Sequence, residues 1–220
     1  MTYLHRDHRG ENIALPTGKV VCVGRNYLQH VAELHNQVPD KPLLFMKPST
    51  SLVALEMGVA VPRGLGECHN ETEIALLIGQ RLSADSDYPV EQAIWGYGLG
   101  LDLTLRQVQD ELKKQGHPWE RAKAFDGSCP ISPFVPAELI AQPDALEFSL
   151  EVNGEMRQQG NSADMLFSIK RLLADIAQVF TLLPGDIVLT GTPKGVAALH
   201  AGDQLQVSFA TFFTIATEVK

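Results

Sequence analysis

The chain has 220 residues, of which 45% are hydrophobic and 20% charged, and its 26 Asp and Glu against 18 Lys and Arg give a formal net charge of -8. This composition indicates an ordinary globular protein with a substantial core and excludes a disordered or fibrous chain. The acidic surplus argues against a nucleic-acid partner, because binding phosphates needs clustered Lys and Arg.

Targeting signals and cysteines bear on the compartment. The first ten residues, MTYLHRDHRG, contain no apolar signal region, and no apolar run approaches the roughly 18–20 residues of a membrane-spanning helix. Three cysteines, Cys22, Cys68 and Cys129, are an odd number without CxxC spacing, so they indicate neither a disulfide framework nor a thiolate metal site. We therefore expect a cytoplasmic protein with no membrane contact.

The first half of the chain predicts strands joined by short helices. KVVCVG (19–24) is typical of a buried strand, Asn26 can cap a helix through about residue 36, and LLFMKP (43–48) follows a proline-containing loop as another strand. ETEIALLIG (71–79) is predicted as a strand that enters the core from a polar cleft. PVEQAIWG (89–96) is expected to form a short helix.

YGLGLDL (97–103) is predicted as a strand with glycine at every second position. Gly96, Gly98 and Gly100 share one face, which allows either a ligand or a packed neighbouring element to approach the backbone closely.

The second half predicts two helices among further strands. TLRQVQDELKKQG (104–116) has helical spacing, residues 146–159 form a hairpin around Asn153-Gly154, and residues 164–180 form an amphipathic helix before the Pro184-Gly185 turn. GDIVLTG (185–191) and the tail 203–219 add strands. We expect one α+β domain over residues 19–220, with many strands and few helices, preceded by a short lead segment, residues 1–18.

Known sequence motifs exclude several chemistries. The chain contains no GxGxxG, GxxxxGK[ST], GxSxG or HExxH, and TGTPKG (190–195) lacks the glycine spacing of a phosphate loop. Nucleotide binding and serine or zinc hydrolysis are therefore not indicated.

Glu71 and Glu73 are the first candidate ligands. Two residues apart on a strand, they point to the same face with Cβ atoms roughly 7 Å apart. Like charges so placed repel unless a cation neutralises them, and an all-oxygen set suits Mg²⁺ or Mn²⁺. The alternative is a solvated strand edge, against which the apolar run that follows argues.

Asp102 is the third carboxylate of interest. It lies in an apolar, glycine-rich segment, where an ionised carboxylate needs a cation or hydrogen bonds; the alternative is an N-cap for the following helix. Arg106 and Gln109 lie on one face of that helix, one turn from Asp102. Lys123 follows in a segment that is expected to be a loop too polar for the core.

His30 and Glu33 form the candidate acid–base pair. At i and i+3 on the helix 26–36, the carboxylate can orient and polarise the imidazole, as in a general base that acts on water. The alternative is a surface ion pair. Among the other histidines, His69 alone shares the face of the two glutamates and is a candidate for supporting them.

Several of these segments, taken in order, resemble the fumarylacetoacetate hydrolase family, in particular its short acylpyruvate hydrolase and oxaloacetate decarboxylase or tautomerase branch. The resemblance runs from about residue 19 to the end, over KVVCVGRNYLQHVAE, LLFMKP, NETEIALLIG, GYGLGLDLTLRQVQ, RAKAFDGSCP, NGE and PGDIVLTGTPKGV. It implies a mixed β-sandwich roll, or partly open barrel, that is usually homodimeric.

The resemblance also implies roles for individual residues. Glu71, Glu73 and Asp102 match the family's Mg²⁺ or Mn²⁺ ligands, and His30 with Glu33 matches a dyad on a mobile lid helix. The positions expected to contact the oxo-acid substrate or to stabilise its negative charge are Arg106, Gln109, Lys123, Thr192 and, more weakly, Lys47. Larger members carry a fourth acidic ligand before the lid, and this chain does not.

The implied activity is metal-dependent hydrolysis of a carbon–carbon bond in an acylpyruvate, such as fumarylpyruvate or acetylpyruvate, with His30 and Glu33 activating water and Lys123 stabilising the oxyanion. The same site allows oxaloacetate decarboxylation or keto–enol tautomerisation, or isomerisation of a 2-hydroxyhepta-2,4-diene-1,7-dioate. A non-catalytic metal-binding protein is the alternative from another class.

Overall fold

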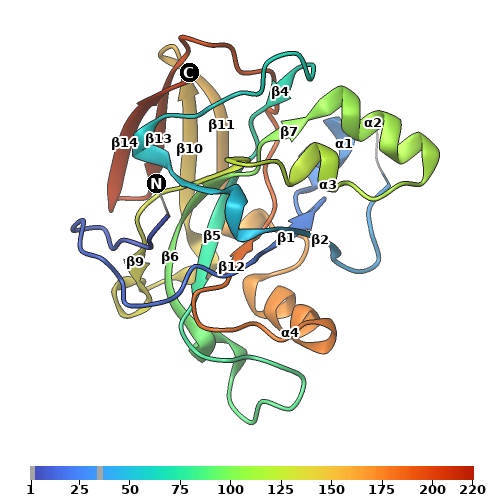
Figure 1. Cartoon of the computed structure of the whole chain (residues 1–220). Coiled ribbons are helices and arrows are strands. Elements are labelled where there is room, and N and C mark those ends of the chain that lie inside the picture. The colour runs from blue at the N-terminus through green and yellow to red at the C-terminus, as the bar shows by residue number, and fades with distance from the viewer. Residues whose placement is uncertain (1–2, 34–36) are drawn as a thin grey trace.

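Two β-sheets form most of the molecule. The computed structural model describes residues 3–33 and 37–220. Within these ranges the larger sheet has eight strands and curls around the core (Figure 1). Its strands are, in spatial order, β2 (Leu43–Lys47), β1 (Val20–Gly24), β12 (Ile187–Leu189), β5 (Thr72–Ile78), β6 (Ile94–Leu101), β8 (Cys129–Ile131) and β3 (Leu52–Ala54), with β9 (Val135–Pro136) also paired to β6. The sheet is mixed, because β1 runs parallel to β12 and β3 parallel to β8, whereas β5 is antiparallel to both of its neighbours.

The second sheet consists of two antiparallel hairpins. Its order is β11 (Glu155–Asn161), β10 (Glu147–Val152), β13 (Gln204–Phe209) and β14 (Phe213–Glu218). Asn153 and Gly154 connect β10 to β11 with φ values of 56° and 80°, the left-handed conformation of a tight hairpin turn. The predicted hairpin is therefore confirmed. A separate short ladder pairs β4 (Cys68–His69) with β7 (Thr104–Leu105).

The helices are short. They are α1 (Leu28–Glu33), α2 (Arg106–Gln115), α3 (Glu120–Lys123) and α4 (Ile169–Val179). Single 3₁₀ turns occupy Ser49–Ser51, Leu55–Met57, Val90–Ala93, Ala137–Leu139, Pro143–Ala145 and Ser162–Asp164. None of the helices in the described ranges combines the length and hydrophobicity that a membrane span requires.

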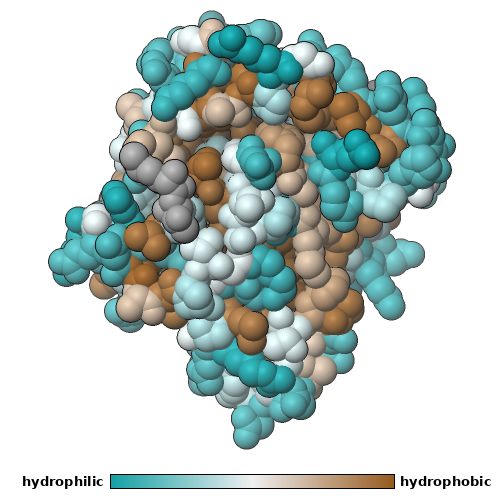
Figure 2. Space-filling view, viewed as in Figure 1, coloured by the Kyte–Doolittle hydropathy of each residue, from teal (hydrophilic) through white to brown (hydrophobic). Residues whose placement is uncertain are grey.

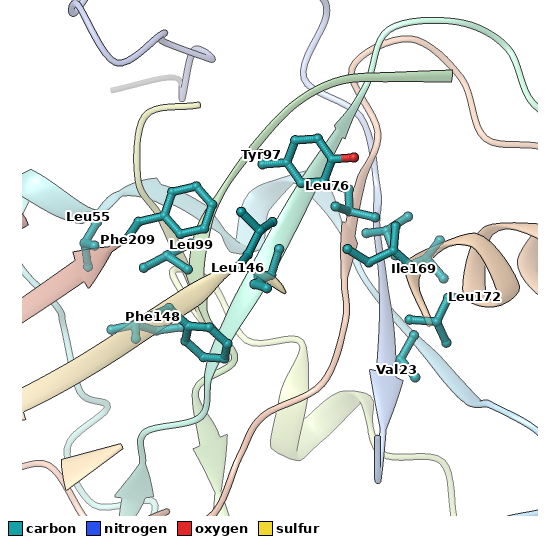
Figure 3. Close-up of a cluster of buried hydrophobic side chains, with 14 of the residues drawn as sticks. Val23, Leu55, Leu76, Tyr97, Leu99, Leu146, Phe148, Ile169, Leu172 and Phe209 are labelled. Carbon is teal, nitrogen blue, oxygen red and sulfur yellow. The ribbon is translucent and has the colours of Figure 1, made fainter. Parts of the chain in front are cut away.

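The main core lies where the two sheets and α4 meet. Strand β5 is buried over its whole length. Because side chains alternate along a strand, Leu76 packs in this main core, whereas Ala75 and Leu77 pack in a smaller cluster on the opposite face of the sheet. Figure 3 shows Phe148 and Phe209 of the four-stranded sheet near Leu99 of β6, and Ile169 of α4 near Leu76. The predicted strand-rich α+β fold is confirmed.

The opposite face of the larger sheet carries a smaller apolar cluster. Tyr3, Ile13 and Leu15 of the N-terminal segment pack against it. The Nε2 atom of His5 lies 3.1 Å from the carbonyl oxygens of both Pro16 and Gly185, which anchors the segment to the turn before β12. The division at residue 18 into lead segment and domain stays a prediction.

The glycines of β6 allow a close approach of the chain that follows β8. A Cβ atom at Gly96 would lie 2.5 Å from the carbonyl oxygen of Val135, and one at Gly98 would lie 2.8 Å from that of Pro133. Of the two alternatives, a ligand or a packed neighbouring element, the packed element therefore explains the repeated glycines.

Three predicted helices have different bounds in the structure. The prediction of a helix at 89–96 is wrong: only Val90–Ala93 form a single 3₁₀ turn, because the chain pairs with β5 from Ile94 onward. The helix predicted from 104 begins at Arg106, since the two preceding residues pair with β4. The helix predicted from 164 begins at Ile169, where the Oγ atom of Ser168 accepts a hydrogen bond from the backbone N–H of Arg171 at 3.4 Å. Residues 34–36 of the helix predicted at 26–36 lie outside the described residues.

Candidate active site

Three carboxylates meet at the end of the β5–β6 ladder. Glu71 and Glu73 flank the first residue of β5, and Asp102 directly follows β6. Antiparallel pairing of Glu73 with Gly100, and a 2.8 Å hydrogen bond from the Asp102 N–H to the Glu71 carbonyl, bring the two segments into register. One oxygen of each carboxylate lies within 4.8 Å of the others, and the residues are only 5%, 2% and 1% exposed, respectively. We refer to these three residues as the carboxylate floor.

Lys123 lies against the carboxylate floor. Its Nζ atom donates to Glu71 Oε2 at 2.7 Å and to Asp102 Oδ2 at 2.6 Å. The segment around Lys123 was expected to be a loop too polar for the core, and this expectation is wrong. Lys123 ends the one-turn helix α3 and is buried, because two carboxylates compensate its charge.

Lys47 lies behind Asp102 and does not line the cavity. It is fully buried, and its ammonium group donates to Ser128 O at 3.1 Å, to Ser128 Oγ at 3.2 Å and to the carbonyl of Lys123. Its Nζ atom also forms an ion pair with Asp102 Oδ1 at 2.8 Å. The expected contact of Lys47 with substrate is therefore not supported; Lys47 supports the floor and the backbone of Lys123 instead.

The alternative role of Asp102 as a helix N-cap is wrong, because α2 begins at Arg106 and Leu105 occupies the cap position without a side-chain hydrogen bond. The carboxylate of Asp102 turns instead to the two lysines, Lys47 and Lys123.

The pKa values of the two glutamates in the floor are shifted in opposite directions. Burial raises the pKa of Glu73 well above its ordinary value, and the charges of Asp102 and Glu71 raise it further. Burial also acts to raise the pKa of Glu71, but Lys123 and Arg106 outweigh it, so that pKa is lowered. Glu73 has a single described hydrogen-bond donor, the Gly191 N–H at 2.6 Å from Oε2.

A divalent cation fits this donor set. The three side chains offer only carboxylate oxygens, which suits Mg²⁺ or Mn²⁺. Asp102 Oδ1 already lies 2.8 Å from Lys47 Nζ, whereas Glu73 forms no ion pair among the described residues. A divalent cation would supply that partner and allow Glu73 to ionise.

The first turn of α2 places two polar side chains beside the floor. The guanidinium group of Arg106 donates to Glu71 Oε1 and, at 2.8 Å, to Gln109 Oε1. The predicted sharing of one helix face by Arg106 and Gln109 is therefore confirmed. His69, a candidate for supporting the glutamates, contacts Arg106 instead, with its Nδ1 atom 3.4 Å from Arg106 Nε.

His30 reaches the cavity from α1. Its Nδ1 atom lies 3.4 Å from Glu33 Oε2, and Glu33 Oε1 accepts a 3.0 Å hydrogen bond from the Gly195 N–H. Burial lowers the pKa of His30 below its ordinary value, although the Glu71 and Glu33 carboxylates act in the opposite direction. The imidazole is therefore neutral near pH 7 and able to accept a proton.

Asn26 connects the start of α1 to the rest of the site. Its Nδ2 donates to Thr190 O at 2.8 Å and to Phe167 O at 3.1 Å, and its Oδ1 accepts from Phe167 N at 2.8 Å. These three bonds join α1 to the chain before α4 and to the loop after β12. The predicted role of Asn26 as the cap of this helix is wrong, because α1 begins at Leu28 and the side-chain oxygen of Asn26 accepts from Phe167 instead of from a helical N–H.

Thr192 lines the cavity, but its hydroxyl group is already engaged. The hydroxyl donates to Thr72 O at 2.9 Å and accepts from Gln158 Nε2 at 2.8 Å. The hydroxyl proton is therefore already used in a hydrogen bond to the backbone of β5. A substrate atom that meets this hydroxyl can use only its remaining lone pair.

Gln158 is a buried residue that the sequence analysis missed. Its Oε1 accepts from Thr72 N at 2.9 Å and from Asn70 Nδ2 at 2.8 Å, while its Nε2 donates to Thr192 Oγ1 and to Pro193 O at 3.1 Å. One amide from β11 therefore joins the strand of the floor to the loop that follows β12. The alternating apolar residues of β10 predicted which of its side chains are buried. The sequence of β11 is polar and has no such alternation, so it did not indicate that Gln158 is buried.

The carboxylate floor, His30, Arg106, Gln109, Lys123 and Thr192 all line one cavity with a volume of about 30 Å³. Of the predicted site residues, Lys47 and Glu33 do not line it. Residues not predicted also line it, among them Arg25, Phe45, Lys113 and Trp119. Lys113 follows Gln109 by four residues on α2, so helical spacing could have indicated it; the two aromatic residues carry no such signal.

The comparisons with known proteins agree with this architecture. The chain is 50% identical over 208 residues to the oxaloacetate tautomerase YcgM of Escherichia coli (strain K12), covering 94% of this chain and 95% of the relative. It is 46% identical over 187 residues, 85% of each chain, to a mitochondrial oxaloacetate tautomerase of Bos taurus.

Solved structures show the same fold. A fumarylacetoacetate hydrolase family protein from Yersinia pestis CO92 matches with a TM-score of 0.96 and 46% identity, over 99% of this chain and 100% of the other. The fumarylpyruvate hydrolase from Pseudomonas aeruginosa in complex with Mn²⁺ and pyruvate matches with a TM-score of 0.90 and 33% identity, over 99% of this chain and 95% of the other. The family model described as fumarylacetoacetate hydrolase, C-terminal, covers residues 19–220, and the chain therefore belongs to the fumarylacetoacetate hydrolase family.

Proposed function

We propose that this protein is an oxaloacetate keto–enol tautomerase that requires Mg²⁺ or Mn²⁺. The observation that carries the proposal is the 50% identity, over nearly the full length of both chains, to a relative named oxaloacetate tautomerase. The cavity supports it, because carboxylates, cations and a neutral histidine converge there. Acylpyruvate hydrolysis, the main expectation from the sequence, becomes the second candidate.

The carboxylate floor would hold the metal ion. Glu71, Glu73 and Asp102 supply the oxygen ligands, and a divalent ion bound there supplies Lewis-acid polarisation of the substrate's 2-oxo group. Arg106 and Gln109 are placed to bind the adjacent carboxylate of an oxo acid, since both line the cavity beside Glu71. A guanidinium group matches a carboxylate in a bidentate manner.

His30 and Lys123 would carry out the proton chemistry. In the keto-to-enol direction, the neutral imidazole of His30 would take a proton from C3 as the electron pair forms the C2–C3 double bond, and the imidazolium would then return this proton to the 2-oxygen, which leaves His30 neutral again. Lys123 stabilises the negative charge on that oxygen, since Asp102 and Glu71 raise the pKa of its ammonium group and keep it protonated despite burial. Glu33 orients the imidazole.

Decay of the enol's ultraviolet absorbance tests this function directly. With Mg²⁺ or Mn²⁺ present, the wild type should accelerate ketonisation of enol-oxaloacetate, and a chelator should remove the effect. Lys123→Met should lower the rate by about a hundredfold, because it removes the cation at the developing charge. Lys170→Met is the matched control, since that exposed lysine pairs with Glu91 outside the cavity.

Two results would contradict the proposal. The first is no acceleration by the metal-loaded wild type, and the second is an equal loss in the Lys123 and Lys170 variants. Metal binding without turnover of oxaloacetate or any acylpyruvate would support the non-catalytic alternative.

The His30–Glu33 pair favours hydrolysis as the second candidate function. A neutral histidine held by a carboxylate can also activate water, and the solved relative from Pseudomonas aeruginosa is named a fumarylpyruvate hydrolase. Release of pyruvate from acetylpyruvate, followed by a coupled dehydrogenase, measures this activity. Acetylpyruvate cleavage with a kcat/KM above that for oxaloacetate tautomerisation would reverse the order of the two candidates.

A further inference from the structure

Helix α2 carries a third polar side chain into the cavity. Arg106, Gln109 and Lys113 recur at intervals of three and four residues, so they follow one face of the helix, and all three line the cavity. The outer side of α2 is hydrophilic in Figure 2. Lys113 is therefore the outermost member of a polar row that begins at the carboxylate floor.

Two aromatic rings connect the ammonium groups of Lys123 and Lys113. The Nζ atom of Lys123 lies 5.1 Å from the centroid of Phe45, whose ring lies 5.8 Å from that of Trp119. The Nζ atom of Lys113 lies 5.5 Å from the Trp119 centroid. The cavity wall thus has one cation at the floor and a second cation at the far end of the aromatic pair, each held over a ring face.

The two cations differ in how well they are neutralised. Lys123 contacts two buried carboxylates at 2.7 Å and 2.6 Å. The nearest carboxylate to Lys113 among the described residues is that of Asp110, at 3.9 Å and half exposed to solvent. Burial, and then the charge of Arg106, lowers the pKa of Lys113, which indicates a cation that is partly desolvated and poorly compensated.

An anion at this end of the cavity would supply the missing compensation. Lys47, Arg106 and Lys123 all have carboxylate partners in the floor, whereas Lys113 has none there. A monocarboxylic oxo acid that binds at Arg106 leaves Lys113 with only its 3.9 Å contact to Asp110. A dicarboxylic oxo acid that lies along the aromatic wall brings a second carboxylate toward it.

We propose that Lys113, held over Trp119, binds the distal carboxylate of a dicarboxylic oxo acid and so makes the site selective for dicarboxylates over monocarboxylates. The inference rests on the proposed function, since it assigns the end of oxaloacetate that the floor does not contact. Lys113 is a specificity-determining residue, and the proton transfer does not involve it.

Oxaloacetate and its 4-ethyl ester are the probes, because the ester removes the distal charge and keeps the reacting carbons. Lys113→Met should raise KM for oxaloacetate about tenfold with little change in kcat, because a charged hydrogen bond to substrate is lost. KM for the ester should stay unchanged. Lys113→Arg should restore most of the oxaloacetate affinity, and Lys114→Met, the exposed neighbour outside the cavity, should behave as wild type.

A change of KM that is the same for both compounds would overturn the proposal, as would an unchanged KM for oxaloacetate in Lys113→Met. Thermal-shift titration with the same compounds and Mg²⁺ separates this inference from the proposed function. If the wild type lacks tautomerase activity but prefers oxaloacetate to the ester, and Lys113→Met loses this preference, then the function fails and the role of Lys113 stands. If the wild type binds both equally, the role of Lys113 fails.

Discussion

The two parts of the candidate site, the carboxylate floor and α1, are held in place by different means. The floor is buried at the end of two central strands, where the β5–β6 ladder sets the register of Glu71, Glu73 and Asp102. Helix α1 is described over six residues, and its Leu28 is 56% exposed. A 3.4 Å contact joins His30 to Glu33, and one backbone N–H, that of Gly195, holds Glu33 to the body of the protein.

This difference matches the two kinds of chemistry that the proposed function requires. Metal binding requires several oxygens at set separations, which a sheet supplies because its ladder hydrogen bonds leave little freedom. Proton transfer requires a base that can adjust to the substrate, and a short helix that is anchored at its start by Asn26 and at Glu33 by one backbone N–H allows small movements between these points. Substitutions in the floor and in α1 can separate the two parts experimentally.

The largest expected effect comes from Glu73→Gln in the floor. The change keeps the shape of the side chain but removes a metal ligand, so Mn²⁺ affinity should fall at least a hundredfold and tautomerase turnover about a thousandfold. The metal-free variant should melt no lower than the wild type, since a buried carboxyl next to two others becomes neutral. Calorimetry measures the Mn²⁺ affinity, the enol absorbance assay measures turnover, and melting curves measure stability. An unchanged Mn²⁺ affinity would remove Glu73 from the ligand set.

The next effect comes from His30→Ala in α1. Tautomerisation and acetylpyruvate cleavage both need a base, so each should fall by about a hundredfold or more. Oxaloacetate decarboxylation needs no water activation and should keep at least about a tenth of its rate if the floor provides its main catalysis. Parallel assays on the three reactions decide this, and equal losses in all three would show that the floor and α1 do not act separately.

Gln158→Leu tests the link between the floor and the loop that holds α1. The change leaves the Thr72 N–H without a buried partner and removes one hydrogen bond each from the Asn70 amide and Thr192, so the free energy of unfolding should fall by about 2–4 kcal/mol. Mn²⁺ affinity should also fall, because Thr72 lies between the two glutamates. Gln159→Leu, the exposed neighbour on β11, is the control, and equal effects in denaturant melts would contradict the assigned role.

The smallest expected effect is a shift of the pH profile in Glu33→Gln. Burial lowers the pKa of His30, and Glu33 partly opposes this by favouring the protonated ring. The neutral ring is the active form, so activity is lost as the pH falls through this pKa. Removing the Glu33 charge should lower the pKa further and move the acid limb of kcat/KM to lower pH by less than about one unit. An upward shift would contradict the arrangement of this pair.

Local patterns account for the parts of the site that could be predicted. The spacing of Glu71 and Glu73 before an apolar strand, the i, i+3 relation of Arg106 to Gln109, and the Asn153-Gly154 turn each depend on the geometry of one element. Element boundaries were less predictable, because pairing with a distant strand decided them, as at the start of α2.

The sequence by itself determined the strand-rich fold, the oxygen-rich ligand set and the resemblance to a family, because residue type, periodicity and motif order are local properties. Only the tertiary structure decided that Lys47 lies behind Asp102, that Lys123 is buried between two carboxylates, and that Gln158 joins the floor to the loop after β12. These contacts join residues far apart in the chain. Their favourable energy exists only after folding has brought the partners together and excluded water, so no single segment encodes them.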